Sequence, residues 1–154
     1  MTGPILCAVD FSDDSRAALL WACGQAELTD AALVVLHVVH DPASSPGFYR
    51  QVDEDWLRPM TGVAEEMMEE FLADVRASAP GRAKLGTAQG RLVSGLPAGR
   101  VIEVAESVGA SMIVVGSRGR TGLPHILLGS VAERIAQTAA VPVVVVKAPA
   151  EEPS

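Results

Sequence analysis

Short, uninterrupted apolar runs recur along this chain and constrain its fold more than any other feature. The strongest are PILCAVD at residues 4–10, ALVVLHVV at 32–39, SMIVV at 111–115 and PVVVV at 142–146. A weaker run covers residues 84–93. Apolar runs that do not alternate with polar residues are typical of strands buried on both faces of a parallel sheet. The chain is therefore expected to build its core around parallel strands.

Segments with helical spacing separate these runs and lie at residues 12–28, 56–77, 96–108 and 130–139. Ser12 or Asp13 is a candidate N-cap for the first helix, where Asp13 and Asp14 complement the helix dipole. Strands that alternate with helices predict right-handed crossovers and a doubly wound sheet. We expect an α/β fold with one five-stranded parallel sheet, four helices and the Rossmann-like strand order 3-2-1-4-5.

The length of 154 residues suits one domain, which we expect to cover residues 1–148 with a frayed tail at 149–154. Aromatic residues make up only 4% of the chain, so the core is expected to be aliphatic. No apolar run approaches the roughly 20 residues that span a bilayer, and the first residues lack the basic region of a signal peptide. Cys7 and Cys23 have neither metal-ligand nor disulfide-framework spacing, which favours a reduced, cytoplasmic protein without membrane association.

Charge is distributed unevenly along the sequence. The whole chain carries −7, which argues against non-specific binding to nucleic acid. Residues 116–147 nevertheless carry +3, because Arg118, Arg120, Arg134 and Lys147 are accompanied only by Glu133. A locally basic stretch rich in glycine, in an otherwise acidic protein, is a candidate for holding a small anion.

A glycine-rich segment opens this basic stretch and reads GSRGRTGLPHILLGS from Gly116 to Ser130. Gly116 and Gly119 permit positive φ angles and allow backbone N–H groups to approach an anion closely. Gly129 and Ser130 open a helix, whose N-terminus presents free N–H groups. Ser130 followed by Glu133 also matches a capping box.

Plainer roles remain open for each of these residues. The glycines can be ordinary turn residues, and Ser130 can serve as a helix cap alone. Arg118 and Arg120 are more often solvated surface charges than ligands. The two roles of Ser130 are compatible, since one hydroxyl can accept a hydrogen bond from the helix and donate one to a phosphate.

The combined spacing is more specific than any single residue. Gly116-x2-Gly119-x9-Gly129-Ser130 is the G-2x-G-9x-G-[S/T] pattern of the ATP-binding branch of the universal stress proteins, and the chain resembles that family. Further similar stretches are VDFS at 9–12, LHV at 36–38, GLP at 95–97, IVVGSRG at 113–119, LGSVAE at 128–133 and VPVVVVK at 141–147. The resemblance therefore covers almost the whole chain.

The resemblance implies a site for ATP, accompanied by Mg²⁺, in the region beyond the carboxyl ends of the strands where such sheets bind ligands. Ala8 and Val38 would border the adenine, and Asp10 would lie near the ribose or the phosphate–metal region. The glycines and Ser130 would hold the phosphates, while Val115 and Ser117 would line the same cleft. The full predicted set is Ala8, Asp10, Val38, Val115, Gly116, Ser117, Arg118, Gly119, Gly129, Ser130 and Val131.

Several neighbouring residues keep a structural alternative. Asp10 could simply cap the helix that follows it, and His37 fits a core or rim histidine more readily than a catalytic one. Residues 41–56 could act as a lid or as a partner surface. The resemblance also implies a homodimer joined through the last strand, Val141–Lys147, where an apolar sheet edge invites pairing with another copy.

The motifs favour binding over turnover. The sequence has no G-x4-G-K-[ST] loop, no cluster of acids for two metals and no Ser/His/Asp arrangement, whereas phosphoryl transfer needs positioned cations and an oriented nucleophile. We therefore expect an ATP-binding universal stress protein that acts in nucleotide-dependent stress response or regulation, with at most weak ATPase activity. The alternatives are a slow ATPase or nucleotidyl-transfer enzyme on the same fold, and an interaction module that has lost the nucleotide.

Overall fold

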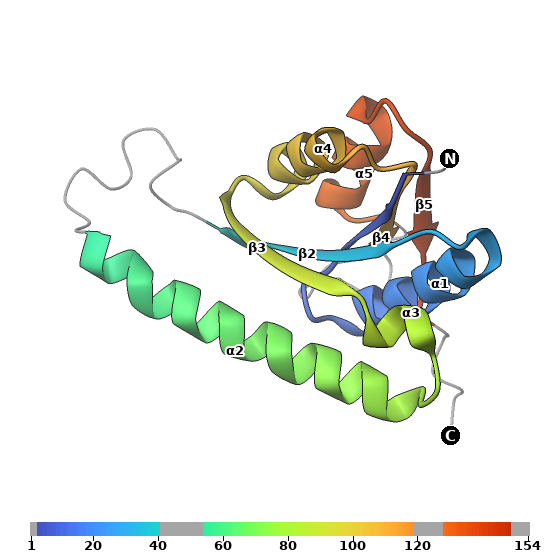
Figure 1. Ribbon diagram of the computed structural model, residues 1–154. Helices are drawn as coiled ribbons and strands as arrows, with labels where there is room; N and C mark the ends of the chain where they lie inside the picture. Colours follow the sequence, from blue (N-terminus) through green and yellow to red (C-terminus); the bar gives the residue numbers. More distant parts are fainter. Residues whose placement is uncertain (1–2, 41–53, 119–127, 149–154) are drawn as a thin grey trace, which may run out of the picture.

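The computed structural model describes residues 3–40, 54–118 and 128–148, which form one α/β unit (Figure 1). Its elements in chain order are β1 (Ile5–Ala8), α1 (Asp13–Thr29), β2 (Leu33–His40), α2 (Glu54–Ser78), α3 (Ala83–Gly86), β3 (Gln89–Gly95), α4 (Pro97–Val108), β4 (Met112–Gly116), α5 (Ser130–Thr138) and β5 (Val143–Val146). Strands and helices alternate along almost the whole chain, as the apolar runs predict.

The five strands form a single parallel sheet in the order β3-β2-β1-β4-β5, so the predicted fold class is confirmed. The chain runs outward from β1 to β2 and β3, and then returns to add β4 and β5 on the other side of β1. The strand order therefore reverses between β1 and β4. In open α/β sheets, the carboxyl ends of the strands at this reversal are where ligands bind.

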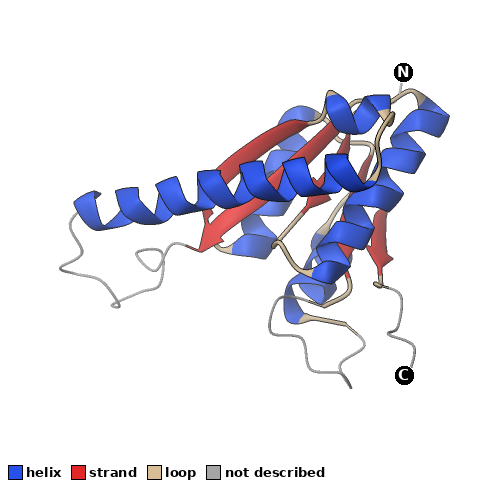
Figure 2. Cartoon of the chain, turned by 90° about the horizontal axis from the view of Figure 1, so that it is seen from below, coloured by secondary structure: helices blue, strands red, loops and turns tan. Residues whose placement is uncertain are grey.

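Helices cover both faces of the sheet. α1, α2 and α3 lie on one face and α4 and α5 on the other (Figure 1), and Figure 2 shows α2 crossing over the strands of its own face. Successive residues of β1 divide between the faces, because side chains alternate along a strand. Ile5 and Cys7 join the core beneath α1 and α2, whereas Leu6 joins the core beneath α4 and α5. Both cores are mainly aliphatic, as expected.

The third strand begins later than the sequence predicts. Instead of a strand over residues 84–93, Ala83–Gly86 forms the short helix α3, and β3 starts at Gln89. Arg76 of α2 supports this arrangement, because its Nε donates to the carbonyl oxygen of Leu85 at 3.1 Å. The described residues thus contain five helices, one more than expected.

Two sequence predictions concern, in whole or in part, residues that the structure does not describe. The tail at 149–154 and residues 41–53 of the candidate lid lie outside the described residues. Within residues 3–40, 54–118 and 128–148, none of the helices combines the length and the apolar character needed to cross a bilayer.

Candidate functional site

The predicted site lies at the carboxyl edge of the sheet, where the strand order reverses. Ala8 ends β1 and pairs with Val115 of β4. Val38 lies near the end of the neighbouring strand β2. Val38 and Val115 are buried in the apolar core beneath α4 and α5, and the partly buried Ala8 packs against that core. The structure therefore brings these strand ends together, while Gly119 lies outside the described residues.

A sharp turn joins β1 to α1 beside this edge. Phe11 has a φ of 68°, a left-handed conformation that a bulky side chain rarely adopts. The carboxylate of Asp10 accepts the amide of Ser12 at 3.0 Å, and the hydroxyl of Ser12 accepts the amide of Ser15 at 3.2 Å. Of the two predicted N-cap candidates, Ser12 is therefore the one that caps α1. Asp10 supports the turn just before the cap, and its contact with a ligand stays a prediction.

Aromatic side chains fix the position of this turn. The ring of Phe11 packs on that of His37 with 4.3 Å between centroids, and it meets Phe71 of α2 in an edge-to-face arrangement with 5.5 Å between centroids. Nδ1 of His37 lies 2.8 Å from the carbonyl oxygen of Val9. A carbonyl only accepts hydrogen bonds, so Nδ1 carries a proton and donates to it. His37 is therefore a rim residue that holds β1 and β2 together at their carboxyl ends.

The carboxylate of Asp14 receives several hydrogen bonds at the start of the glycine-rich segment. Its Oδ2 accepts the hydroxyl of Ser117 at 3.0 Å, the backbone amide of Arg118 at 3.0 Å and the Nε of Arg118 at 3.1 Å. Its Oδ1 accepts the backbone amide of Ala148, just beyond β5, at 2.9 Å. The Asp14 side chain is only 5% exposed. Donors of the protein therefore satisfy this buried carboxylate.

These partners keep Asp14 ionised. Burial alone would raise the pKa of Asp14, because a buried site disfavours the charged form. The hydrogen bonds from Arg118, Ala148 and Ser117 outweigh burial and hold this pKa below its usual value. Asp14 in turn raises the pKa of the Arg118 guanidinium, which remains charged. A buried anion and a partly exposed cation thus meet at the first residues of the glycine-rich segment.

Gly116 is a glycine because α1 passes directly against it. A Cβ at this position would lie 2.8 Å from the carbonyl carbon of Asp14 and 2.9 Å from the amide nitrogen of Ser15. Both are backbone atoms, which cannot rotate away as a side chain can. Gly116 does not use the positive φ that glycine permits, since the glycines with positive φ in the described part of the chain are Gly81, Gly95 and Gly109. Helix packing therefore explains this glycine, and its contact with a phosphate stays a prediction.

The glycine-rich segment ends at Gly129, which caps α5 in place of Ser130. Gly129 is extended, with φ −71° and ψ 157°, and its carbonyl accepts the amide of Glu133 at 2.9 Å. No side chain caps this helix, so the predicted capping box is wrong by one residue. Ser130 and Val131 form the exposed first turn of α5. The Ser130 hydroxyl therefore lies beside the helix N-terminus without serving as its cap.

The two ends of the glycine-rich segment are joined at its base. The amide of Gly129 donates to the carbonyl of Ser117, and the amide of Ser117 donates to the carbonyl of Val146 at 2.8 Å. Ser117 is 1% exposed and its hydroxyl is bonded to Asp14. Its side chain thus supports the segment from the α1 side, and its contact with a ligand stays a prediction.

Sequence reasoning missed the role of Asp14, to which it assigned only the helix dipole. A signal was nevertheless present. Ala18, Ala22 and Ala26 follow Asp14 at intervals of four residues, and all three are fully buried. A carboxylate on the buried stripe of a helix requires hydrogen-bonding partners. This register predicts that Asp14 faces the sheet.

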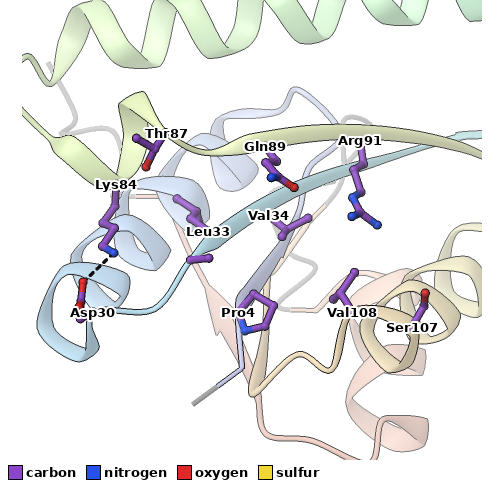
Figure 3. A pocket seen from close by; sticks show the side chains of 11 residues that line it. Pro4, Asp30, Leu33, Val34, Lys84, Thr87, Gln89, Arg91, Ser107 and Val108 are labelled. Carbon is purple, nitrogen blue, oxygen red and sulfur yellow. Dashed lines mark hydrogen bonds and ion pairs between the residues drawn. The ribbon is translucent and has the colours of Figure 1, made fainter. Parts of the chain in front are cut away.

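A separate cavity of about 760 Å³ lies at the opposite end of the sheet, near the amino ends of β1 and β2 (Figure 3). Pro4, Val34 and Val108 form apolar parts of its wall, and Gln89 and Arg91 of β3 project into it. None of the predicted site residues lines this cavity. Its position at the amino ends of the strands separates it from the edge where the sheet order reverses.

The described residues also allow a test of the predicted metal. In residues 3–40, 54–118 and 128–148, no three His, Cys, Asp or Glu side chains are grouped as a metal centre. The groups at the carboxyl edge are instead the first amides of α5, the Ser130 hydroxyl, the Arg118 guanidinium with its partner Asp14, and the Asp10 carboxylate. Such groups fit a phosphate whose own oxygens hold most of a Mg²⁺ coordination shell.

Comparison with known sequences identifies the family of this chain. A model described as the universal stress protein family matches residues 1–147. Universal stress protein MJ0531 of Methanocaldococcus jannaschii is 34% identical over 148 residues, which cover 96% of this chain and 84% of that protein. Universal stress protein YxiE of Bacillus subtilis is 32% identical over 151 residues, covering 96% of this chain and all of that protein.

Solved structures show the same fold. The structure of MJ0577 from M. jannaschii has a TM-score of 0.76 at 25% identity and covers 98% of this chain and all of its own. A universal stress protein in complex with cAMP has a TM-score of 0.66 at 21% identity, covering 97% and 100% of the two chains. The universal stress protein of Archaeoglobus fulgidus in complex with dAMP has a TM-score of 0.60 at 23% identity, covering 94% and 98%.

Proposed function

This chain belongs to the universal stress protein family, and from that premise we propose that it is an ATP-binding regulatory protein. ATP with Mg²⁺ would bind at the carboxyl ends of β1, β2 and β4. The observation that carries the proposal is the joining of Ser117 and Gly129 at this edge. That hydrogen bond holds both ends of the glycine-rich segment beside the uncapped N-terminus of α5.

The chemistry of this edge supports a phosphate ligand. The first amides of α5 have no side-chain cap, and a helix N-terminus favours a negative charge. Ser130 adds a hydroxyl, and Arg118 is 33% exposed, so both side chains can be reached by an anion. Phosphate groups would therefore lie between the glycine-rich segment and the first turn of α5.

The apolar strand ends support an adenine base. Ala8, Val38 and Val115 contribute to one apolar cluster near the carboxyl ends of three neighbouring strands. The ligands in the two solved complexes, cAMP and dAMP, both carry adenine. We infer that the base would lie against these residues and that Asp10 would lie nearer the ribose and phosphates. When bound, Mg²⁺ would neutralise phosphate charge, and Asp10, the one carboxylate of the predicted set, would be available to hold it.

The regulatory output would be a change in shape or partner affinity when ATP occupies the site. A homodimer is part of this proposal. β5 is an edge strand and its four valines, Val143–Val146, are only partly buried, so a second copy could cover them. Sedimentation at micromolar concentration is expected to show a dimer, and a purely monomeric protein would contradict this part of the proposal.

Calorimetric titration with Mg·ATP, followed by analysis of the recovered nucleotide, tests the proposal. We expect micromolar binding, with ATP recovered intact after the titration. Steady conversion to ADP would favour the slow ATPase, and no binding would favour an interaction module that has lost the nucleotide.

A matched pair of variants tests whether the glycine-rich segment is the binding element. Gly119→Val is expected to abolish binding, because a side chain at this glycine would keep the backbone away from the phosphates. Gly99→Val in α4 is the control, since a Cβ at Gly99 meets no atom within 4 Å. Unchanged affinity in Gly119→Val would refute the assignment of the segment.

A further inference from the structure

Asp14 connects three parts of the molecule through one side chain. It belongs to the first turn of α1, its Oδ2 holds Ser117 and Arg118, and its Oδ1 holds the amide of Ala148. Ser117 and Arg118 begin the glycine-rich segment, and Ala148 follows the edge strand β5 by two residues. The proposed nucleotide site and the proposed dimer edge therefore meet at a single carboxylate.

The surroundings leave Asp14 little freedom to move. The backbone of Asp14 lies so close to Gly116 that even a methyl group would not fit between them. The amide of Ser117 is bonded to the carbonyl of Val146, so the start of the segment and the end of β5 are also joined directly. A shift at one of these places must therefore be accommodated by the carboxylate or by the adjoining backbone.

Arg118 is the member of this group that a ligand can reach. Its guanidinium is 33% exposed, whereas the Asp14 side chain is 5% exposed. A phosphate at the glycine-rich segment would compete with Asp14 for this guanidinium. Asp14 would then depend on its remaining donors, the Ser117 hydroxyl and the amides of Arg118 and Ala148. Those hydrogen bonds are expected to tighten, because a buried carboxylate must stay satisfied.

We propose that Asp14 is a positioning residue that couples nucleotide binding at the glycine-rich segment to pairing of β5 with a second copy. The inference rests on the proposed ATP site and on the proposed dimer. Nucleotide would draw Arg118 outward, strengthen the bond between Asp14 and Ala148, and order the end of β5. Because coupling between two binding events is reciprocal, dimer formation would raise the affinity for ATP by the same factor.

The test measures the dimer dissociation constant by sedimentation, with and without saturating Mg·ATP, together with hydrogen exchange at the Ala148 amide. In the unmodified protein we expect ATP to lower the dimer dissociation constant by at least about 5-fold, which is the lower end of typical coupling factors. Protection of the Ala148 amide should rise in parallel. ATP binding to an unmodified dimer whose dissociation constant and Ala148 protection do not change would overturn the coupling and leave the proposed function standing.

In the Asp14→Asn variant, ATP is expected to leave the dimer dissociation constant unchanged. It should also leave the hydrogen-exchange rate of the Ala148 amide unchanged. Asp13→Asn is the matched control, because Asp13 is exposed in the same helical turn and loses the same charge. A folded Asp14→Asn variant that keeps the full effect of ATP would overturn the proposal. If that variant does not fold, Arg118→Gln decides the question, since it removes only the partly exposed partner. It should bind ATP more weakly and lose the coupling at saturating ATP.

Failure of the proposed function gives a different result. If the unmodified protein does not bind ATP at all, the titration reports this before any dimer measurement, and both proposals fall together. If it binds ATP but remains monomeric, the dimer and the coupling fall while the nucleotide site stands.

Discussion

Replacing Gly116 by alanine adds one methyl group at the closest approach between β4 and α1. The new Cβ would lie 2.8 Å from the carbonyl carbon of Asp14, 2.9 Å from its Cβ and 2.9 Å from the amide nitrogen of Ser15. Inserting a methyl group into a packed site typically costs about 1–3 kcal/mol. Moving α1 away to make room would also lengthen the hydrogen bonds to Asp14, and one hydrogen bond to a charged group contributes about 1.5–3 kcal/mol. We expect a loss of about 2–4 kcal/mol in the free energy of unfolding.

Urea unfolding followed by circular dichroism measures this loss. For a slope of about 2 kcal/mol per molar urea, the midpoint should fall by about 1–2 M. Gly99→Ala is the control, because its Cβ meets no atom within 4 Å and alanine is favoured over glycine inside a helix by about 1 kcal/mol. The control is expected to raise the midpoint slightly. A Gly116→Ala variant as stable as the unmodified protein would refute the close packing of α1 on β4.

Three further predictions concern single side chains. Asp14 has a lowered pKa in the folded state, so its ionisation stabilises the protein above the unfolded pKa, and this contribution is lost as the pH falls through the folded value. The difference in unfolding free energy between the unmodified protein and Asp14→Asn should therefore narrow below about pH 4. Urea midpoints measured over a series of acidic pH values would show this. A difference that stays constant with pH would contradict the prediction. Ser130→Ala should bind ATP more weakly in calorimetry while its melting temperature stays unchanged, because Ser130 does not cap α5; a marked loss of stability would argue for a capping role. Burial raises the pKa of both Cys7 and Cys23, so a thiol reagent should label them only on unfolding, and rapid labelling of the native protein would contradict the buried positions.

The central strands could be predicted from sequence because burial on both faces leaves a continuous apolar run. Residues 32–39 and 111–115 carry this signal, and β2 and β4 follow them closely. The edge strand β3 lacks it, since Gln89, Gly90 and Arg91 are exposed at its start. Leu85 is the fully buried apolar residue of the predicted strand at 84–93. It belongs to α3 and joins the core that α2 covers. The start of β3 is therefore set by its pairing with β2, whereas the other edge strand, β5, is apolar enough to be predicted from the run at 142–146.

The place of the glycine-rich segment between β4 and α5 could be predicted from the sequence, but its hydrogen bonding could not. The glycine spacing identifies the segment and its place after β4, because that spacing is a property of the chain alone. Gly116 and Ser117 prove to be held by Asp14, a residue about one hundred positions earlier, and no local pattern reports such a contact. The difference between the predicted cap of α5, Ser130, and the observed cap, Gly129, has a similar cause. It depends on the extended ψ of Gly129, which the bond to Ser117 helps to fix.

The bond between the Gly129 amide and the Ser117 carbonyl also bears on how the chain can change in length. Because this bond joins Ser117 directly to Gly129, we expect the number of residues between them to affect the sheet mainly through the entropy of closing that stretch. Doubling the length of such a closed stretch costs only about 0.6 kcal/mol of chain entropy. Insertions here would therefore leave the unfolding free energy almost unchanged. The protein thus has a point at which new recognition sequences can be added at little thermodynamic cost, directly beside the proposed phosphate site.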